Sequence, residues 1–240
     1  MQRERRSILV VDNSASFVFY IAMMLKKFQY AVQVASTAED ALTIIARSAP
    51  AVVITDTALS RTSGVDLLKQ MKQNASIGFI PVLIHTADAD PATKDACIHA
   101  GCAGYFQKPV DPDALYRAIQ TATEATPRKN IRISVALKAR VGGAAGVRVE
   151  DVTSLSEGGL YVKTTAPDPV KAQVPLTLLL RDREIGVTAV VLYSSAKVGG
   201  PHAVPGMGMR FETIAPNDRD LIRDFIHEQV TNALGTETKK

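Results

Sequence analysis

The first 122 residues alternate between two kinds of segment, and this alternation limits the chain to few folds. Short apolar runs with the composition of buried strands lie at 8–11, 30–36, 51–56, 80–87 and 103–109. Segments with apolar residues at helical spacing follow these runs at 15–28, 37–49, 64–73, 91–101 and 111–125. Five strands that alternate with five helices predict a parallel sheet with helices on both faces.

Polar side chains stand where four of these strands end. Asp12 and Asn13 follow the first strand, Asp56 ends the third, Thr86 the fourth and Lys108 the last. Each one alone is ordinary as a helix cap or loop residue. Because parallel strands end at the same edge of a sheet, we expect these side chains to converge. Two carboxylates and an amide oxygen suit Mg²⁺, and a carboxylate can accept a phosphoryl group whose oxygens a lysine and a hydroxyl neutralise.

On these residues, 7–122 resembles a CheY-like response-regulator receiver domain, which has a flavodoxin-like fold, and we assign 1–122 to it. The resemblance implies that Asp56 is the phosphoacceptor, supported by Thr86 and Lys108, with a histidine kinase or another phosphodonor as partner. It also implies that Mg²⁺ is bound by Asp12, Asn13 and Asp56.

Three further expectations follow from the resemblance. Tyr105 is the expected switch aromatic, Gly64 the turn glycine after the acceptor, and the Lys108–Pro109 peptide is expected to be cis. The chain departs from the family at Asn13, where a second acid usually contacts Mg²⁺. One negative charge is therefore missing, and we expect weakened metal binding and weakened phosphorylation.

The periodicity changes after a small, polar linker at 123–127. Six short segments with strand character follow at 131–141, 147–152, 158–164, 174–180, 185–194 and 206–213. They predict a six-stranded antiparallel β-barrel, followed by a C-terminal helix at 217–234. We assign 128–240 to this second domain.

Two arginines and a glycine-containing turn suggest the chemistry of this domain. Arg128 and Arg132 stand four apart in RKNIR, Ser156 and Gly159 lie in SLSEGG, and GMGMRF forms the last strand. On these motifs, residues 127–233 resemble a PilZ domain, the receptor module for cyclic-di-GMP. The resemblance implies an arginine clamp, since guanidinium groups bind phosphate and the guanine edge bidentately.

The opposite wall of that implied site departs from the family. Ser156 and Gly159 match its motif, but Ser154 stands where an Asp or Asn normally reads the guanine edge. Asp151 lies nearby, three residues out of register. We expect Ser154 to bind guanine less well than a carboxylate or amide would.

The charge of the chain is uneven. Residues 1–122 carry 12 basic and 11 acidic residues, whereas Arg128 to Arg148 includes six basic residues and no acid. This run is either a solvated face, a site for an anionic ligand or a nucleic-acid surface. Nucleic-acid binding is disfavoured because aromatic residues do not interleave with the basic ones.

Two cysteines in 240 residues are too few for a disulfide framework and fit a reducing cytoplasm. Cys97, His99 and Cys102 could bind zinc, but no second ligand pair follows, which favours a structural role at a helix end. No apolar run is long enough to span a membrane, and Asp12 interrupts the only stretch that a signal peptide could use.

Together these features predict a non-enzymatic bacterial signalling protein of the two-component type. It would receive phosphorylation and cyclic-di-GMP as inputs and act through an unidentified effector protein, not through DNA. The alternative is a scaffold in which both modules are degenerate and act only through protein surfaces.

Overall fold

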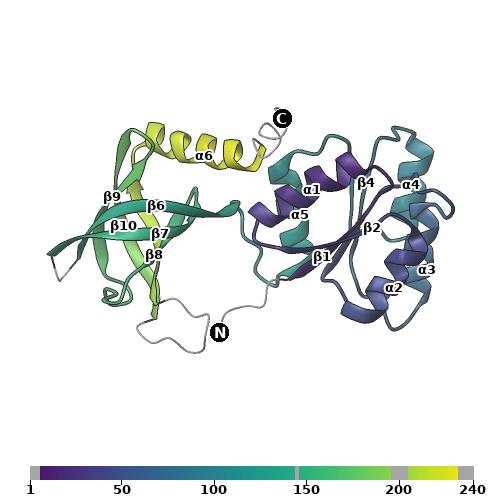
Figure 1. The fold of residues 1–240 in the computed structure, drawn as a ribbon, viewed down its shortest axis with the longest axis horizontal. Helices are drawn as coiled ribbons and strands as arrows, with labels where there is room; N and C mark the ends of the chain where they lie inside the picture. The colour runs from purple at the N-terminus through teal and green to yellow at the C-terminus, as the bar shows by residue number, and fades with distance from the viewer. Residues whose placement is uncertain (1–5, 144–145, 196–204, 232–240) are drawn as a thin grey trace. The chain divides into compact units, whose positions relative to one another are not determined.

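The computed structural model describes residues 6–143, 146–195 and 205–231 (Figure 1). The chain divides into two compact units, one built on residues 4–129 and the other on residues 130–229. Predictions that concern residues 1–5, 232–234 and the end of the second domain therefore lie outside the described residues.

The first unit contains a five-stranded parallel sheet in the order β2-β1-β3-β4-β5. Its strands are β1 (Ser7–Val11), β2 (Ala31–Ala35), β3 (Val52–Thr55), β4 (Val82–Thr86) and β5 (Gly104–Gln107). Every predicted strand is present, and the predicted doubly wound α/β fold is confirmed. β1 lies between β2 and β3 at the point where the strand order reverses, so Asp12 follows the strand at that crossover.

Helices cover both faces of this sheet (Figure 1). They are α1 (Ala15–Lys27), α2 (Ala38–Ser48), α3 (Gly64–Gln73), α4 (Pro91–His99) and α5 (Pro112–Thr123). Polar residues begin them: the Thr37 hydroxyl, for example, accepts the Asp40 N–H at 3.1 Å. The N-cap of α1 is Ser14, whose hydroxyl accepts the Phe17 N–H. Asp12 and Asn13 therefore do not cap this helix.

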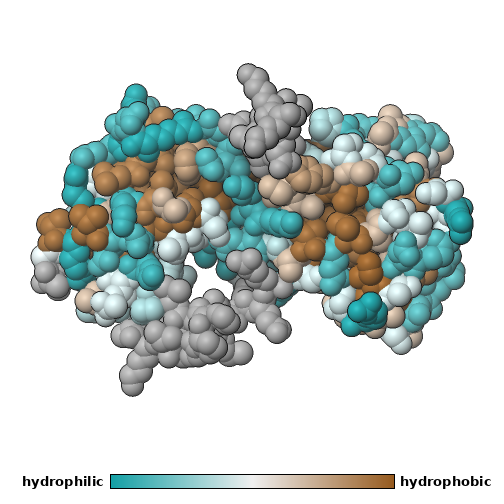
Figure 2. Space-filling view, viewed as in Figure 1, coloured by the Kyte–Doolittle hydropathy of each residue, from teal (hydrophilic) through white to brown (hydrophobic). Residues whose placement is uncertain are grey.

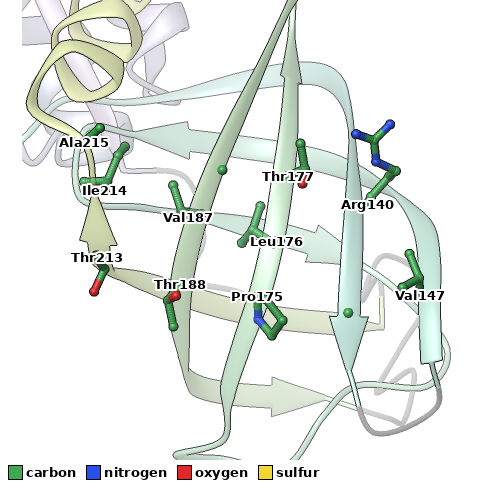
Figure 3. A pocket seen from close by; sticks show the side chains of 12 residues that line it. Arg140, Val147, Pro175, Leu176, Thr177, Val187, Thr188, Thr213, Ile214 and Ala215 are labelled. Carbon is green, nitrogen blue, oxygen red and sulfur yellow. The ribbon is translucent and has the colours of Figure 1, made fainter.

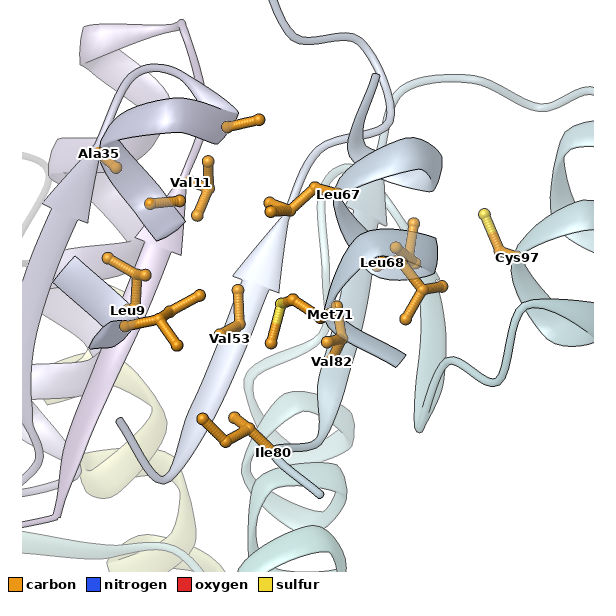
Figure 4. Close-up of a cluster of buried hydrophobic side chains, with 14 residues drawn as sticks. Leu9, Val11, Ala35, Val53, Leu67, Leu68, Met71, Ile80, Val82 and Cys97 are labelled. Carbon is orange, nitrogen blue, oxygen red and sulfur yellow. The ribbon is translucent and has the colours of Figure 1, made fainter. Parts of the chain in front are cut away.

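Buried aliphatic side chains join the sheet to the helices (Figure 4). Leu9, Val53 and Val82 come from three neighbouring strands and pack against Leu67 and Met71 of α3. Because both faces of the central strands are covered, these strands are apolar almost without interruption. This packing holds the carboxyl ends of β1, β3 and β4 in one row.

The second unit is a closed antiparallel barrel in the order β10-β11-β8-β7-β6-β9. Its strands are β6 (Arg132–Gly143), β7 (Gly146–Ser156), β8 (Gly159–Lys163), β9 (Gln173–Leu180), β10 (Arg183–Ser195) and β11 (Gly206–Ile214). The predicted six-stranded barrel is confirmed. β7 is longer than predicted, and Ser156 is its last residue and not a turn residue.

The barrel is filled by side chains that alternate along the strands. Met207, Met209 and Phe211 of β11 are buried, whereas Arg210 and Glu212 between and beyond them are exposed. The C-terminal helix α6 (Pro216–Thr231) follows, and it buries Ile222 and Ile226. Arg181 in the β9–β10 turn pairs with Glu228 of α6 and lies over the ring of Phe225.

The predicted linker 123–127 begins within the last turn of α5, which ends at Thr123. Arg6 binds the Thr123 carbonyl and pairs with the Glu124 carboxylate at 3.4 Å. The Arg128 N–H donates to Gln120 Oε1 at 3.1 Å. These bonds hold both ends of the segment against the first unit, and the domain boundary itself stays a prediction.

Apolar side chains reach the surface of both units (Figure 2). The large exposed ones include Phe19, Val34 and Phe79 in the first unit and Val147 and Val149 in the second. Within the described ranges, every helix is too short or too polar to cross a lipid bilayer.

Candidate functional site

A lysine bridges two buried carboxylates at the carboxyl edge of the parallel sheet. Lys108 Nζ donates to Asp12 Oδ2 at 2.6 Å and to Asp56 Oδ2 at 2.5 Å. Asp12 and Asp56 are 3% and 7% exposed, so these ion pairs are shielded from water. The predicted convergence of the three strand ends is therefore present. Two acids share one cation, which leaves this pocket with a net negative charge.

The Asp56 carboxylate is held in one orientation. Its Oδ1 accepts the Ala58 N–H at 3.1 Å, while its Oδ2 faces Lys108. Burial acts to raise the pKa of Asp56, but the hydrogen bonds from Lys108, Thr86 and Ala58 outweigh it, so the pKa lies below its ordinary value. Asp56 is therefore ionised at neutral pH, as a nucleophilic carboxylate must be.

The Thr86 hydroxyl is hydrogen-bonded on two sides. It lies 2.6 Å from the Thr57 hydroxyl and accepts the Asp88 N–H at 3.1 Å. Thr57 also approaches Asp56 Oδ1 at 3.4 Å, so a short chain of hydroxyls connects Asp56 to Thr86. Sequence reasoning missed Thr57. Its position next to Asp56 is the one signal that pointed to it.

Three further predictions concern the surroundings of this pocket. The Tyr105 hydroxyl donates to the Asp88 carbonyl at 2.9 Å, and the Lys108–Pro109 peptide is cis, as predicted. Gly64 lies so close to Asp56 that a Cβ there would stand 1.8 Å from the Asp56 carbonyl oxygen. Only glycine fits this position, which explains why a glycine begins α3.

Phe17 and His85 form an apolar wall that sequence reasoning missed. The Phe17 ring centroid lies 3.9 Å from Lys108 Nζ and 4.6 Å from the His85 ring centroid. His85 is 1% exposed, and neither of its ring nitrogens has a hydrogen-bond partner within the described part of the chain. Burial, followed by the charge of Lys108, lowers the pKa of His85 to about 4. His85 is therefore a neutral imidazole behind the pocket.

The predicted metal ligands offer the hard oxygen atoms that Mg²⁺ requires. Asp12 and Asp56 each supply a carboxylate, but both present an oxygen to Lys108, and Asn13 is exposed. No cluster of three or more His, Cys, Asp or Glu side chains suited to a metal occurs among the described residues. The oxygen atoms of these residues are of the kind that Mg²⁺ binds, and Mg²⁺ binding here stays a prediction.

An apolar groove of about 650 Å³ opens beside Asp12 and Asn13. Phe19 of α1, Val34 of β2 and Ile44 of α2 line it. The half-exposed Phe19 and Val34 side chains make this side of the first unit hydrophobic.

The zinc alternative is not supported. Cys97 is buried within the core beside Leu68, as Figure 4 shows, and Cys102 is a free thiol outside α4. His99 is exposed, and its Nδ1 lies 2.7 Å from the Asp95 carbonyl oxygen of its own helix. These residues serve the end of α4, in agreement with the structural role that the sequence favours.

In the barrel, strand register brings most of the predicted nucleotide ligands together. Arg132 of β6 pairs with Ser156 of β7, Ser156 with Gly159 of β8, and Gly159 with Arg210 of β11. Paired residues of antiparallel strands point to the same face. Arg132, Ser156, Gly159 and Arg210 therefore form a row across four strands, which we call the arginine row. Sequence reasoning did not single out Arg210, because β8 and β11 are far apart in the chain.

A second row runs beside the first. Ser134 pairs with Ser154, Ser154 with Tyr161 of β8, Tyr161 with Gly208 of β11, and Gly208 with Tyr193 of β10. Ser154 thus lies one strand from Tyr161 and two residues from Ser156. The Ser156 hydroxyl donates to the Gly159 carbonyl at 3.0 Å, which braces the turn between β7 and β8 and leaves the oxygen free to accept.

Arg128 belongs to the segment after α5 and to the first unit. Its backbone N–H is bonded to Gln120, and Arg128 is exposed to solvent. The structure therefore does not place Arg128 together with the barrel ligands, and its role in a clamp stays a prediction.

Ion pairs occupy half of the basic run from Arg128 to Arg148. Lys138 pairs with Asp151 at 2.5 Å, and Arg140 pairs with Glu184. Arg148 pairs with the buried carboxylate of Asp168 at 2.8 Å. Half of the basic residues in a run that is acid-free in sequence are therefore paired with acids from other parts of the second unit, and this weakens the nucleic-acid alternative further.

A separate hollow of about 530 Å³ lies on the barrel (Figure 3). Arg140, Pro175, Thr177 and Thr188 are among its lining residues. None of the predicted nucleotide ligands lines it, and its arginine is engaged by Glu184.

Comparison with protein families agrees with both folds. The model of the response regulator receiver domain matches residues 8–120, and the model of the PilZ domain matches residues 126–228. The chain therefore joins a response regulator receiver domain to a PilZ domain. Both are signalling domains.

The curated relatives named here match about half of this chain. An uncharacterized 14.6 kDa protein of Leptolyngbya boryana is 30% identical over 120 residues, which are 50% of this chain and 92% of that protein. Protein PilH of Pseudomonas aeruginosa is 29% identical over 47% of this chain and 93% of PilH. Transcriptional regulatory protein ZraR of Salmonella typhimurium is 30% identical, and the chain spans 32% of it.

Among solved structures, a putative response regulator from Chloroflexus aurantiacus is 28% identical to this chain with a TM-score of 0.48. The match covers 50% of this chain and 98% of that one.

Proposed function

We propose that this protein combines two inputs, phosphorylation of Asp56 and binding of cyclic-di-GMP by the PilZ domain, and passes them to a protein partner. The observation that carries the proposal is the pocket in which Lys108 bridges Asp12 and Asp56, since it supplies an ionised acceptor and the cation to balance a phosphoryl group. A histidine kinase or another phosphodonor would supply that group.

In the phosphorylation step, an oxygen of Asp56 forms a bond to the phosphorus of the donor, and the bond from phosphorus to the donor breaks. Lys108 would then balance the charge of the transferred oxygens. Asp12, Asn13 and Asp56 would hold Mg²⁺, which supplies charge neutralisation at the phosphoryl group. Thr86 would exchange its bond with Thr57 for one with the phosphoryl oxygens.

Labelling of the chain by acetyl phosphate in the presence of Mg²⁺ tests this part of the proposal. We expect weak labelling of the wild type and none in Asp56→Asn, which keeps the shape of the side chain and removes the nucleophile. Equal labelling of the two proteins would refute Asp56 as the acceptor.

Asn13→Asp should lower, by roughly tenfold, the Mg²⁺ concentration at which half of the response to beryllofluoride is reached, because it restores a third negative charge near the cation. The measurement is an NMR titration that follows the amides near Thr86 and Tyr105. Asn74→Asp is the matched control. Asn74 caps the carboxyl end of α3, far from the site, so this substitution adds the same charge away from the site. An unchanged midpoint in Asn13→Asp would show that the missing charge does not limit binding.

For the nucleotide, we propose that the arginine row binds one side of cyclic-di-GMP. Arg132 would pair with a phosphate or with the guanine edge, and Ser154, Ser156 and Gly159 would form the facing wall. Arg128 would be the second arginine of the clamp by its place four residues before Arg132. Arg210 lies on the same face and extends the positive charge of the row.

Calorimetric titration of the full chain with cyclic-di-GMP tests the ligand. We expect binding below a dissociation constant of about 100 μM, which corresponds to about −5.5 kcal/mol. No binding at that concentration would refute the sensor function. Binding regained in Ser154→Asp alone would support the alternative, a scaffold that has kept the fold and lost its ligand.

A further inference from the structure

Two tyrosine rings lie side by side on the outer face of the barrel. Tyr161 of β8 and Tyr193 of β10 both pair with Gly208 of the strand between them. Their ring centroids are 6.2 Å apart and their planes differ by 29°. Tyr193 is 49% exposed. The two rings therefore form one nearly flat aromatic surface, which we call the tyrosine pair.

The glycines of β11 create the space for these rings. A Cβ at Gly208 would lie 2.2 Å from Tyr193 Cζ, and a Cβ at Gly206 would lie 2.8 Å from Tyr161 Cε1. Both rings thus occupy the volume that side chains on the outer face of β11 would fill. Met207 and Met209 point into the barrel. The methionines of this strand therefore fill the barrel interior, and the glycines between them leave room for the aromatic rings on the outer face.

The tyrosine pair adjoins the residues proposed to bind the nucleotide. Tyr161 is the direct pairing partner of Ser154, and it lies two residues from Gly159 on the same strand. The Tyr161 ring leans over Gly206 of β11, on the same outer face as the arginine row and on the side of β8 that faces away from Ser154. An aromatic surface and a cluster of guanidinium groups thus share one face of the barrel.

We propose that the tyrosine pair is a stacking platform for one guanine base of cyclic-di-GMP. This inference rests on the proposed nucleotide function and adds to it two binding residues outside the arginine and serine motifs. Stacking acts on the face of a base and needs no partner on its edge. It would therefore supply affinity that does not depend on Ser154, which has a hydroxyl in place of the carboxylate or amide that reads the guanine edge.

The test is calorimetric titration of the full chain and its variants with cyclic-di-GMP. Tyr161→Ala and Tyr193→Ala should each weaken binding about tenfold, in the range for loss of one base–aromatic stack. Tyr161→Phe and Tyr193→Phe should bind within about twofold of wild type, because phenylalanine keeps the ring. Leu192→Ala is the matched control, since Leu192 is 48% exposed, next to Tyr193, and outside the pair.

Two further measurements separate stacking from a loss of folding. The chain has no tryptophan and six tyrosines, so tyrosine emission is readable directly. Cyclic-di-GMP should quench it in wild type and quench it less in Tyr193→Phe, which still binds. Gly208→Ala should also weaken binding, because its new methyl group displaces the Tyr193 ring without altering any tyrosine.

The outcomes distinguish this inference from the proposed function. If wild type binds and the two alanine variants bind equally well, or no worse than Leu192→Ala, the platform is wrong and the nucleotide function stands. If wild type does not bind cyclic-di-GMP, both are wrong. Selective weakening in the alanine variants, with retained binding in the phenylalanine variants, supports the platform.

Discussion

Replacement of Arg132 by alanine should weaken cyclic-di-GMP binding by about 1.5–3 kcal/mol, or about 10- to 150-fold, the range for hydrogen bonds to charged groups. Arg132 is the first residue of β6 and pairs with Ser156. Its side chain therefore points to the same face of the barrel as the other residues proposed to bind the nucleotide. Arg132→Lys should recover little of the loss, because lysine keeps the charge and loses the bidentate fork. Arg128→Ala should have a similar effect if both arginines form the clamp.

Arg140→Ala provides the matched control for this prediction. Arg140 lies on the same strand, but it pairs with Glu184 and lines the hollow of Figure 3. Its loss removes the same charge from the barrel and should leave binding nearly unchanged. Equal losses in Arg132→Ala and Arg140→Ala would mean that net charge, and not a specific contact, attracts the ligand. Ser154→Asp should tighten binding if a guanine-reading carboxylate is what the chain lacks.

The receiver should lose stability in mild acid because of His85. Its pKa of about 4 in the folded chain lies below the ordinary value of 6.5, so the unfolded chain takes up a proton between these two values and the folded chain does not. Stability should therefore fall as pH falls from about 6.5 to about 4. Between pH 7.5 and pH 5 the loss should be about 2 kcal/mol.

Urea unfolding at these two pH values, followed by the helical circular dichroism signal, measures this loss. His85→Phe should remove most of the pH dependence, since phenylalanine fills the space beside Phe17 without a titrating group. His99→Gln is the control, because His99 is exposed on α4. A pH dependence that survives in His85→Phe would show that carboxyl groups, and not the buried imidazole, cause the acid sensitivity.

Much of the fold could be predicted because its signals are local. Apolar runs of strand length and helical spacing defined every element of the receiver, and the change to alternation after residue 130 defined the barrel. Because parallel strands end at one edge of a sheet, the positions of Asp12, Asp56 and Lys108 at strand ends were enough to predict that they meet. Errors fell at boundaries, as in β7, where two serines expected outside the strand continue it.

The sequence by itself determined the two fold classes and the residue types at the sheet edge, because hydrophobic periodicity and the ends of strands are local features of the sequence. Tertiary structure alone decided which distant residues meet. Thr57 bonds to Thr86 because β3 and β4 are neighbours, and Phe17 covers Lys108 because α1 begins at the sheet edge where β5 ends. Tyr161 and Tyr193 lie side by side because β11, with its glycines, lies between their strands. Such contacts depend on strand order and register, which follow from the packing of the whole barrel or sheet and from no local pattern.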